Sequence, residues 1–599
     1  MTGLLEQYRN PVPFLDEKRH TNPDPFVMRW CGRWYCYATD ELGVKVSISE
    51  DLVHWRFKGY AIQEPEYRNY WAPSVLYQNG IFYMYYSNIP AAADDCHDEH
   101  LKLAVSDSPV GPFQRKKTFF KEFSIDSHPV AWNGRLYLFY SVNNWLGSAD
   151  RVAGTCILVD ELVTPEELAG HPRPAVLPSL RQEVYAENRF GDGRDWYTIE
   201  GAASVVHGDR FWLLYSANAY LNEDYFIGTA VAPCKSELLD MAWEKYPDAY
   251  TWRPLLKKNR DMEGTGHNTV TKAPNMLDDW IVYHARRMDE VRDPALEQRE
   301  MCIDPLWFNG RELLCFGPTA DVREAPGKPQ LQVREKSIRE RTIFYTESAC
   351  YYAEFWISAR RQHTGTRYGL YLSWQSERDY LEFQLHTGRG EAQVICCADG
   401  ISRCVQRVPL EKQYDYTVPH LIRVSRCFDE YSIWMDEGNA LTFTDSESAS
   451  GGGELGIIPY FTELTLHSLS VTEAAILQGG SLRHLGKFYD VTPGWIDDTG
   501  YSGLNGHTEL RFKLYSRNFT EEFQLEVCGG ENAFVYRCPG LTGVEARNKR
   551  DSYAVYHIVR DGREKFILDG TETQWHSMEG AGGWELENIK IAVYRFTKN

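Results

Sequence analysis

The chain has 599 residues, which is enough for several domains with sizeable cores. Its formal net charge is −20 and it has no stripe of clustered Lys and Arg, so the composition predicts no nucleic-acid partner. No apolar run is long enough to span a bilayer, so we expect no membrane partner. The start of the chain lacks an apolar segment with a small-residue cleavage site, and the 14 Cys are scattered. Both features favour a cytoplasmic protein with reduced thiols.

A short strand pattern recurs in the first half of the chain. Each copy has a tight turn, then alternating aromatic and aliphatic residues, and ends in a small residue. The copies are 32–39 (GRWYCYAT), 80–87 (GIFYMYYS), 134–141 (GRLYLFYS), 208–216 (GDRFWLLYS) and 279–285 (DWIVYHA, without the glycine). Further strands follow most copies, with no alternating amphipathic helices. The pattern therefore predicts an all-β fold that begins with a five-bladed β-propeller at residues 1–324; a β-sandwich with coincidental hairpins is the alternative.

Acidic residues recur at one position relative to the turn glycines. Counting back eight residues from Gly32, Gly134 and Gly208 gives Asp24 (32−24), Asp126 (134−126) and Glu200 (208−200), and the remaining copy has Ala72 (80−72). In a propeller, the strand before that hairpin is the innermost one, so equivalent positions converge on the central axis. We therefore expect three carboxylates to meet in one funnel.

Like charges brought together raise the pKa of at least one of them, so such a cluster serves either proton transfer or cation binding. A lone acid of this kind would more often be a turn residue or a strand cap. Asp24 lies between Pro23 and Pro25 in NPDP, and Pro25 predicts an extended backbone at Asp24. Glu200 precedes Gly201-Ala202-Ala203, small residues that leave space for a ligand.

The stretches NPDPFV, YWAPSV, SDSPVGPF, IDSHP, TIEGA and GTGHNTV, in this order, resemble glycoside hydrolase family 43 over residues 9–322. The resemblance implies a five-bladed propeller that hydrolyses glycosidic bonds with inversion at the anomeric carbon. It implies that Asp24 is the general base, that Glu200 is the general acid, and that Asp126 orients the acid and adjusts its pKa. It also implies a sugar-facing Trp71, a sugar contact from Arg299, and His267 near the axis.

In many members of this family the axial histidine holds a calcium or other ion through water, so the resemblance implies a structural Ca²⁺ near His267 and no required cofactor. An ordinary hydrogen-bonded core histidine is an equal alternative. Around Asp126 the chain departs from the family and reads HPVAWNG, which leaves the neighbouring subsite undefined. Arg286 and Arg287 compete with Arg299 for the sugar contact.

Other residues near the predicted site have less specific patterns. Trp145 and Tyr197 lie in loops near Asp126 and Glu200, where they form either a stacking wall for a sugar or buried packing. The stretch 96–100 (CHDEH) has several metal-capable side chains, but adjacent residues seldom converge on one ion, so a solvated loop is predicted there.

The remainder of the chain also reads as strands. Residues 325–329 (APGKP) predict a linker, and alternating segments at 330–475 predict a β-sandwich that resembles the concanavalin-like modules often appended to this family. A second strand-rich stretch predicts another sandwich-like module at 480–599. Either could bind sugar, wall the funnel or support a dimer, and the oligomeric state stays open.

The sequence thus predicts a glycosidase that removes terminal pentose from plant-derived oligosaccharides or polysaccharides. α-L-Arabinofuranose comes first, and β-D-xylosidase or galactofuranosidase activity is the alternative. A non-catalytic carbohydrate-binding propeller is disfavoured because all three carboxylates are present. A retaining fructoside hydrolase would carry Asn-Asp-Pro-Asn-Gly near its start, and a phosphorolytic propeller needs a basic phosphate pocket.

Overall fold

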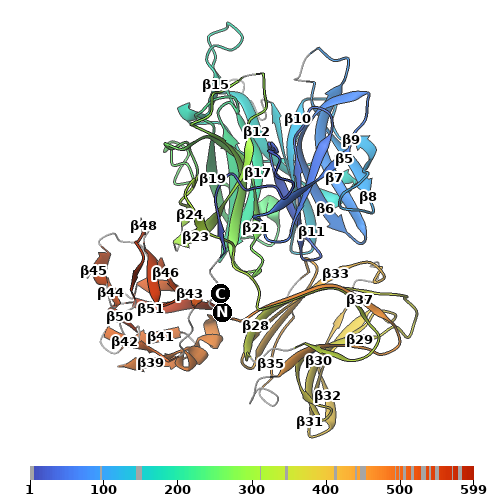
Figure 1. The fold of residues 1–599 in the computed structure, drawn as a ribbon, viewed down its shortest axis with the longest axis vertical. Coiled ribbons are helices and arrows are strands. Elements are labelled where there is room, and N and C mark those ends of the chain that lie inside the picture. The colour runs from blue at the N-terminus through green and yellow to red at the C-terminus, as the bar shows by residue number, and fades with distance from the viewer. Residues whose placement is uncertain are drawn as a thin grey trace. The chain divides into compact units, whose positions relative to one another are not determined.

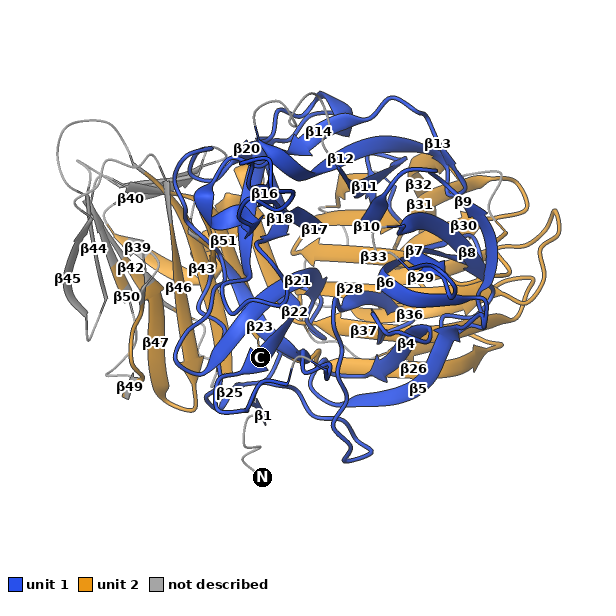
Figure 2. Cartoon of the chain, turned by 90° about the horizontal axis from the view of Figure 1, so that it is seen from above, with its two compact units in different colours: residues 1–307, 315–327, 437–439 blue, residues 308–314, 328–436, 440–599 orange. Residues whose placement is uncertain are grey.

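The computed structural model describes residues 6–94, 98–143, 152–293, 295–309, 312–344, 348–410, 415–438, 441–445, 453–492, 494–497, 500–503, 507–513, 518–527, 534–538, 541–546, 552–568, 571–577, 583–587 and 589–598. These residues form two compact units: 1–307, 315–327 and 437–439 make up unit 1, and 308–314, 328–436 and 440–599 make up unit 2. Figure 2 colours the two units blue and orange. No helix in these ranges is long and apolar enough to cross a lipid bilayer.

Five sheets, each built mainly of antiparallel strands, follow one another through unit 1 (Figure 1). The first contains β2 (Phe26–Trp30), β3 (Arg33–Ala38), β4 (Val44–Ser49) and β5 (Trp55–Ile62). The second contains β6 (Tyr67–Gln78), β7 (Ile81–Pro90), β8 (His100–Ser106) and β9 (Gln114–Thr118). The third contains β10 (Ser124–Trp132), β11 (Arg135–Asn143) and β12 (Ala153–Thr164), which also pairs with β13 (Glu167–Leu168), β14 (Arg173–Val176) and β16 (Trp196–Tyr197); β15 (Val184–Ala186) pairs with β16.

The fourth sheet contains β17 (Ile199–His207), β18 (Arg210–Ala217), β19 (Phe226–Pro233) and β20 (Glu244–Lys245). The fifth contains β21 (Met262–Lys272), β22 (Asp279–Arg287), β23 (Glu300–Asn309) and β24 (Glu312–Cys315). A two-stranded sheet pairs β1 (Gln7–Tyr8) with β25 (Arg323–Glu324). Each recurrent sequence pattern is the second strand of its sheet: β3, β7, β11, β18 and β22.

The first strands of the five sheets form a closed ring. β2 contacts β6, β6 contacts β10, β10 contacts β17, β17 contacts β21, and β21 returns to β2. In Figure 2, β6, β10, β17 and β21 lie around the centre of the blue unit, while β5 and β9 lie at its edge. The predicted five-bladed propeller is therefore confirmed, with the innermost strands where the register argument placed them.

Apolar clusters hold neighbouring blades together. One cluster joins Tyr37 of the first blade to Phe82 of the second, and another joins Leu103 of the second to Leu138 of the third. A third lies between blades three and four, and a fourth joins blade five to blade one and to the N-terminal segment. Successive side chains of a strand point to opposite faces of its sheet, and each face packs against a neighbouring blade. The aromatic residues of the repeated pattern therefore form the interfaces between blades.

Unit 2 contains four larger sheets and two main apolar cores. Strands β26 (Leu331–Ile338), β37 (Leu464–Thr472), β28 (Cys350–Ala359), β33 (His420–Cys427), β34 (Glu430–Met435) and β35 (Leu441–Thr444) form one sheet. Strands β27 (Thr342–Phe344), β36 (Glu454–Pro459), β29 (Tyr368–Ser376), β30 (Asp379–His386), β31 (Glu391–Ala398) and β32 (Ile401–Pro409) form the sheet that shares its core. Two packed antiparallel sheets around one core make a β-sandwich.

The other two sheets of unit 2 share a second core. One contains β38 (Ala474–Gln478), β51 (Ile589–Lys598), β43 (Asn518–Val527), β46 (Ser552–Arg560), β47 (Arg563–Leu568), β48 (Thr571–Glu572) and β49 (His576–Ser577). The other contains β39 (Tyr489–Thr492), β42 (His507–Phe512), β50 (Gly583–Glu587), β44 (Phe534–Cys538) and β45 (Leu541–Ala546), and β40 (Gly494–Asp497) pairs with β41 (Gly500–Gly503). The fold class is as predicted, with further β-sheet domains after the propeller.

Candidate active site

Four of the five innermost strands, β6, β10, β17 and β21, are interrupted by a β-bulge at an equivalent position. The register shifts directly after Trp71, Ile125, Glu200 and Gly266, where two residues have no partner on the second strand. The first residue of each bulge has a positive φ, as does Asp24 just before β2: Asp24 53°, Ala72 37°, Asp126 57°, Gly201 64° and His267 42°. A bulge redirects a side chain out of the regular alternation. The positive-φ residues at equivalent positions bring Asp24, Asp126 and His267 into one group.

The backbone at Asp24 differs from the sequence prediction. Pro25 predicted an extended conformation, but φ at Asp24 is 53°, in the left-handed region. Contacts with the fifth blade and with Thr39 of its own blade override this local preference. Asp24 N–H donates to His284 Nδ1 at 3.1 Å, and its carboxylate accepts from Thr39 and Arg299.

The register of Glu200 also needs correction. The bulge of the fourth blade begins at Gly201, so Glu200 lies one residue before the position of Asp24 and Asp126. In the first three hairpins, both central residues have positive φ and the glycine is the second, as in a type I′ turn. In the fourth hairpin, Gly208 is the first central residue, as in a type II′ turn, so counting back from it is off by one.

The bulges are tied to neighbouring blades through their backbone N–H groups. Ala72 N–H donates to Thr39 Oγ1 at 2.9 Å, His267 N–H to Ser216 Oγ at 2.7 Å, and Gly201 N–H to Asp126 Oδ2 at 3.1 Å. Thr39 and Ser216 are small residues that end the recurrent strand pattern. Their hydroxyl groups therefore satisfy buried donors of the next blade.

Asp24 has the surroundings of an ionised carboxylate. Thr39 Oγ1 donates to Oδ2 at 2.6 Å and Arg299 Nη1 donates to Oδ1 at 3.1 Å, while His267 Nδ1 lies 3.4 Å from Oδ1. Burial by itself raises the pKa of Asp24, but the Arg299 charge, with His267 and His284, holds it well below the usual range. Arg299 is itself fixed by Glu297, whose carboxylate accepts from Nε and Nη2 at 3.0 and 2.8 Å.

Glu200 and Asp126 have the surroundings of protonated or proton-sharing carboxyl groups. Burial, together with the charge of Asp24, raises the pKa of Glu200 to about 7, against the opposing effects of Tyr225 and Arg299. Burial and the charges of Glu200 and Asp24 raise the pKa of Asp126 well above its usual range. The resemblance implies that Asp126 adjusts the pKa of Glu200. The structure instead makes burial the first cause.

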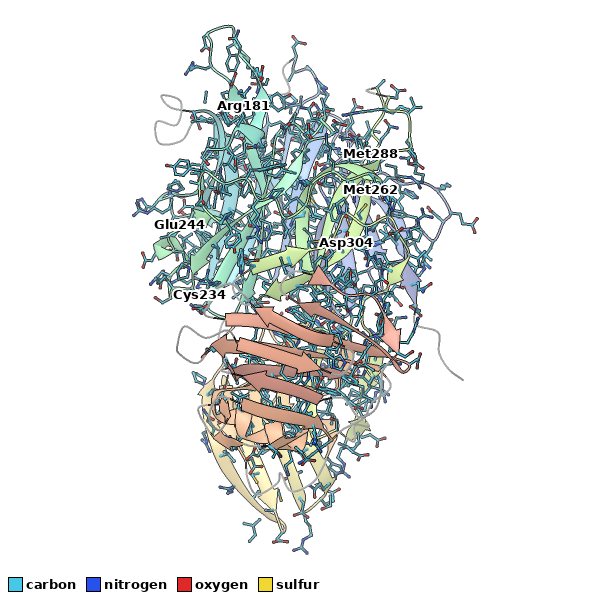
Figure 3. The ribbon with its side chains drawn as sticks, turned by 90° about the vertical axis from the view of Figure 1, so that its left-hand side faces the viewer. Arg181, Cys234, Glu244, Met262, Met288 and Asp304 are labelled. Carbon is cyan, nitrogen blue, oxygen red and sulfur yellow. The ribbon has the colours of Figure 1, made fainter. Side chains whose placement is uncertain are left out.

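Asp24, Asp126, Glu200, His267 and Arg299 therefore converge from four blades. His267 Nδ1 faces two of the acids, at 3.4 Å from Asp24 Oδ1 and 3.9 Å from Asp126 Oδ2. In the fifth blade, Met262 and Met288 lie at one end and Asp304 lies further along (Figure 3). His267 and Arg299 belong to the Met262 end, since Met262 pairs with Arg287, and Ala285 pairs with Glu300.

The sequence model of the glycosyl hydrolases family 43 matches residues 8–311. The chain belongs to this family. Residues 8–311 are therefore a glycosyl hydrolase family 43 domain. The predicted family resemblance is confirmed.

Known members give distant matches. The extracellular exo-α-(1→5)-L-arabinofuranosidase of Streptomyces avermitilis is 25% identical over 265 residues, which are 42% of this chain and 50% of that enzyme. The β-xylosidase of Bacillus subtilis is 22% identical over 303 residues, 47% of this chain and 51% of that enzyme. The chain thus spans about half the length of these two relatives. A solved thermostable family-43 glycoside hydrolase is 30% identical, covering 54% of this chain and 99% of its own, with a TM-score of 0.45.

Two further predicted residues lie in the second and third blades. Trp71 is partly exposed in β6, directly before the Ala72 bulge. Tyr197 is partly exposed in β16, and its neighbour Trp196 is buried with an edge-on contact to Phe190 at 5.6 Å. Trp145 lies outside the described residues.

The two competing arginines are engaged elsewhere. Arg286 binds the Glu263 carboxylate at 2.9 Å and two backbone carbonyl groups, and Arg287 pairs with Asp289. Of the three arginines, Arg299 is therefore the one that reaches Asp24.

Sequence reasoning missed several residues of the site. Tyr225 donates to Glu200 Oε1 at 2.7 Å, His284 accepts from Asp24 N–H, and Thr39 bridges Asp24 and Ala72. The small residue ending each strand pattern was the available signal for Thr39. The loop predicted to be solvated at 96–100 has a described part, 98–100, in which Glu99 is fully buried, and burial raises its pKa to about 9. Its charge also acts on Asp126.

Proposed function

We propose that this glycoside hydrolase inverts the anomeric carbon and releases terminal pentose, with α-L-arabinofuranose ahead of β-D-xylose, from plant-derived oligosaccharides or polysaccharides. The observation that carries the proposal is the contrast between the donors of two acids in one group, the Arg299 guanidinium at Asp24 and the Tyr225 phenol at Glu200. Asp24 is ionised beside Arg299, whereas burial keeps Glu200 protonated up to about pH 7. Carboxyl groups whose surroundings separate their pKa values are the expected base and acid of such a reaction.

In this mechanism Asp24 accepts a proton from a water molecule as the water oxygen attacks the anomeric carbon. The glycosidic C–O bond breaks, its electron pair goes to the leaving oxygen, and Glu200 donates its proton there. The Asp126 carboxylate accepts a hydrogen bond from the N–H group of Gly201, the residue after the acid. Burial and the charge of Glu200 raise the pKa of Asp126. The reaction has no step for a metal.

An ion at His267 would be structural, held through water, because Arg299 already supplies positive charge beside Asp24. Calcium favours six to eight oxygen ligands, whereas His267 offers a nitrogen directed at two carboxylates. These residues do not form an all-protein calcium cage.

The preference for arabinofuranose rests on the Streptomyces relative, and β-D-xylosidase is the alternative favoured by the Bacillus subtilis relative. The test is kcat/KM on nitrophenyl α-L-arabinofuranoside, β-D-xyloside and β-D-galactofuranoside in one buffer. We expect the arabinofuranoside to be highest, with side activity on the others, since one group in a pocket changes the barrier by only about 1–3 kcal/mol. A xyloside value about tenfold above the arabinofuranoside value would reverse the ranking.

Product stereochemistry tests inversion independently of the sugar. Proton NMR of the first-formed sugar from the preferred substrate should show the opposite anomer to the substrate. A retained anomer, or a trapped glycosyl-enzyme, would overturn the assignment of Asp24 as a base.

A further inference from the structure

The Glu200 carboxyl group accepts a hydrogen bond from a tyrosine that directly precedes the third strand of its own blade. Tyr225 Oη donates to Glu200 Oε1 at 2.7 Å. The residue lies immediately before β19, and only 1% of its surface is exposed. Burial and the nearby carboxylates raise the pKa of Tyr225 well above its usual value, so the phenol remains a donor at neutral pH.

The ring of Tyr225 is fixed in a slot formed by the fifth blade. It lies parallel to the His284 ring, with centroids 5.8 Å apart and an interplanar angle of 4°. On the Gly266 side, a Cβ atom at residue 266 would lie 1.8 Å from ring Cε1, so only glycine leaves room for the ring. His284 in turn accepts from Asp24 N–H. The slot therefore fixes the phenol relative to both the acid and the base.

A donor on one carboxyl oxygen decides where the proton of that carboxyl group resides. Because Oε1 accepts from Tyr225, the protonated form of Glu200 carries its proton on Oε2. When Oε2–H breaks and its proton bonds to the leaving oxygen, negative charge develops on the carboxylate. The hydrogen bond from Tyr225 then becomes charge-assisted and stronger.

We propose that Tyr225 is the positioning residue of the acid, which directs the proton of Glu200 to Oε2 and stabilises the carboxylate that forms as the leaving group departs. The proposal rests on the proposed role of Glu200 as general acid. It adds to that role a residue that acts through the Glu200 carboxyl group.

The test is Tyr225→Phe, which keeps the ring in its slot and removes only the hydroxyl group. We expect kcat on substrates with sugar leaving groups to fall roughly 10- to 100-fold, the value of one hydrogen bond to a charged group. Nitrophenyl substrates should lose much less, because their leaving groups need little protonation. Burial raises the pKa of Glu200 and the hydrogen bond from Tyr225 lowers it, so removal of that bond should raise the pKa further and move the alkaline limb of the kcat/KM pH profile to higher pH.

Tyr215→Phe is the matched control. Tyr215 lies in the same blade, is 2% exposed, and donates to the buried Glu183 carboxylate at 3.3 Å, away from the acid group. It should change stability without moving the alkaline limb. Replacing Tyr225 by 3-fluorotyrosine, a more acidic phenol, should shift the limb to lower pH, and this replacement gives the readout if Tyr225→Phe fails to fold.

Glu200→Gln separates the two proposals. Near-wild-type turnover of Glu200→Gln would overturn the proposed function itself. A severe loss in Glu200→Gln, with an unchanged alkaline limb and leaving-group dependence in both Tyr225 replacements, would overturn the role of Tyr225 alone.

Discussion

Asp24 is buried and Glu200 is partly buried in the same group of side chains, yet their surroundings favour opposite protonation states. The difference comes from one cation: Arg299 hydrogen bonds directly to Asp24, whereas Glu200 has a neutral phenol as its donor. Glu297 accepts hydrogen bonds from two of the Arg299 nitrogens, so the guanidinium stays directed at Asp24. The ring of Tyr220 lies 4.6 Å from the Arg299 guanidinium carbon and adds a cation–π contact.

The pH profile should report this asymmetry. In the proposed reaction Glu200 acts as an acid only while it is protonated. The value of kcat/KM should therefore be retained below a pH of about 7 and lost as the pH rises through that value.

Asp24→Asn and Glu200→Gln should each lower kcat by about 10²–10⁴-fold or more on unactivated substrates. Activated leaving groups should rescue Glu200→Gln and not Asp24→Asn. Stopped assays of both variants, with circular dichroism as a folding check, measure these losses. A wild-type pH profile that rises through pH 7 would contradict the assignment of Glu200 as the acid.

Gly201 is required at its position for two separate reasons. Its φ of 64° disfavours any side chain, and a Cβ atom there would lie 3.2 Å from the His267 ring. Gly201→Ala should therefore lower the free energy of unfolding by about 1–2 kcal/mol for the backbone alone, with a further loss from the His267 contact. It should also lower kcat, because His267 faces Asp24 and Asp126.

Gly208→Ala provides the control for that experiment. Gly208 has φ of 60° in the hairpin of the same blade, and a Cβ atom there meets nothing within 4 Å. Urea unfolding of both variants should show the larger loss for Gly201→Ala, and only that variant should lose activity. Equal stability and activity in the two variants would show that the His267 contact is unimportant.

At the scale of the strands, the bulges and their ties between blades position the site. A bulge leaves a backbone N–H group without a ladder partner, and a buried N–H group must find another acceptor. The hydroxyl groups at the ends of β3 and β18 are those acceptors for the second and fifth blades. The feature that orients the acids thus also joins one blade to the next.

Thr39→Val tests this coupling of stability and activity. The variant keeps the shape of the side chain, but leaves Ala72 N–H without its acceptor and Asp24 Oδ2 without its donor. We expect the free energy of unfolding to fall by about 1–3 kcal/mol and kcat to fall with it. Thr39→Ser keeps the hydroxyl group and should retain most of both. Equal denaturation midpoints for the two variants would contradict the role of the hydroxyl group.

At the scale of the whole molecule, apolar clusters between successive blades bring together residues from Asp24 to Arg299. The positive charge at the centre comes from the protein, through Arg299. Among the described residues, the group with metal-ligand spacing is Asp429, Glu430 and His484 in unit 2, where Arg483 already pairs with both acids.

Chelation should therefore leave kcat/KM unchanged after prolonged dialysis against EDTA, and any loss should follow the melting temperature. The reason is that no step of the proposed reaction passes through a metal, and Arg299 already neutralises charge beside Asp24. The measurement is kcat/KM and thermal unfolding before and after dialysis. Complete inactivation reversed by adding back calcium would show that an ion at His267 takes part in the chemistry.

The repeated strands, their hairpins, and the candidate acids were all readable from the sequence, because alternating aromatic residues and turn glycines are local signals with a fixed period. The family resemblance added His267 and Arg299. The position of Glu200 relative to the bulge was not readable by counting, because a type II′ turn in the fourth hairpin places its glycine one residue earlier.

The resemblance implied which carboxyl group is the base, but only the tertiary structure shows the contacts that favour its ionised form. A pKa depends on burial and on charges brought close by folding, and Arg299 is 275 positions away from Asp24 in the chain. The same holds for Tyr225, which reaches Glu200 across its blade, and for Glu99, which is buried in a stretch whose composition predicted a solvated loop. The sequence alone determined which residue types are available and on which strands they lie; the closure of five blades around one axis determined what each of them can do.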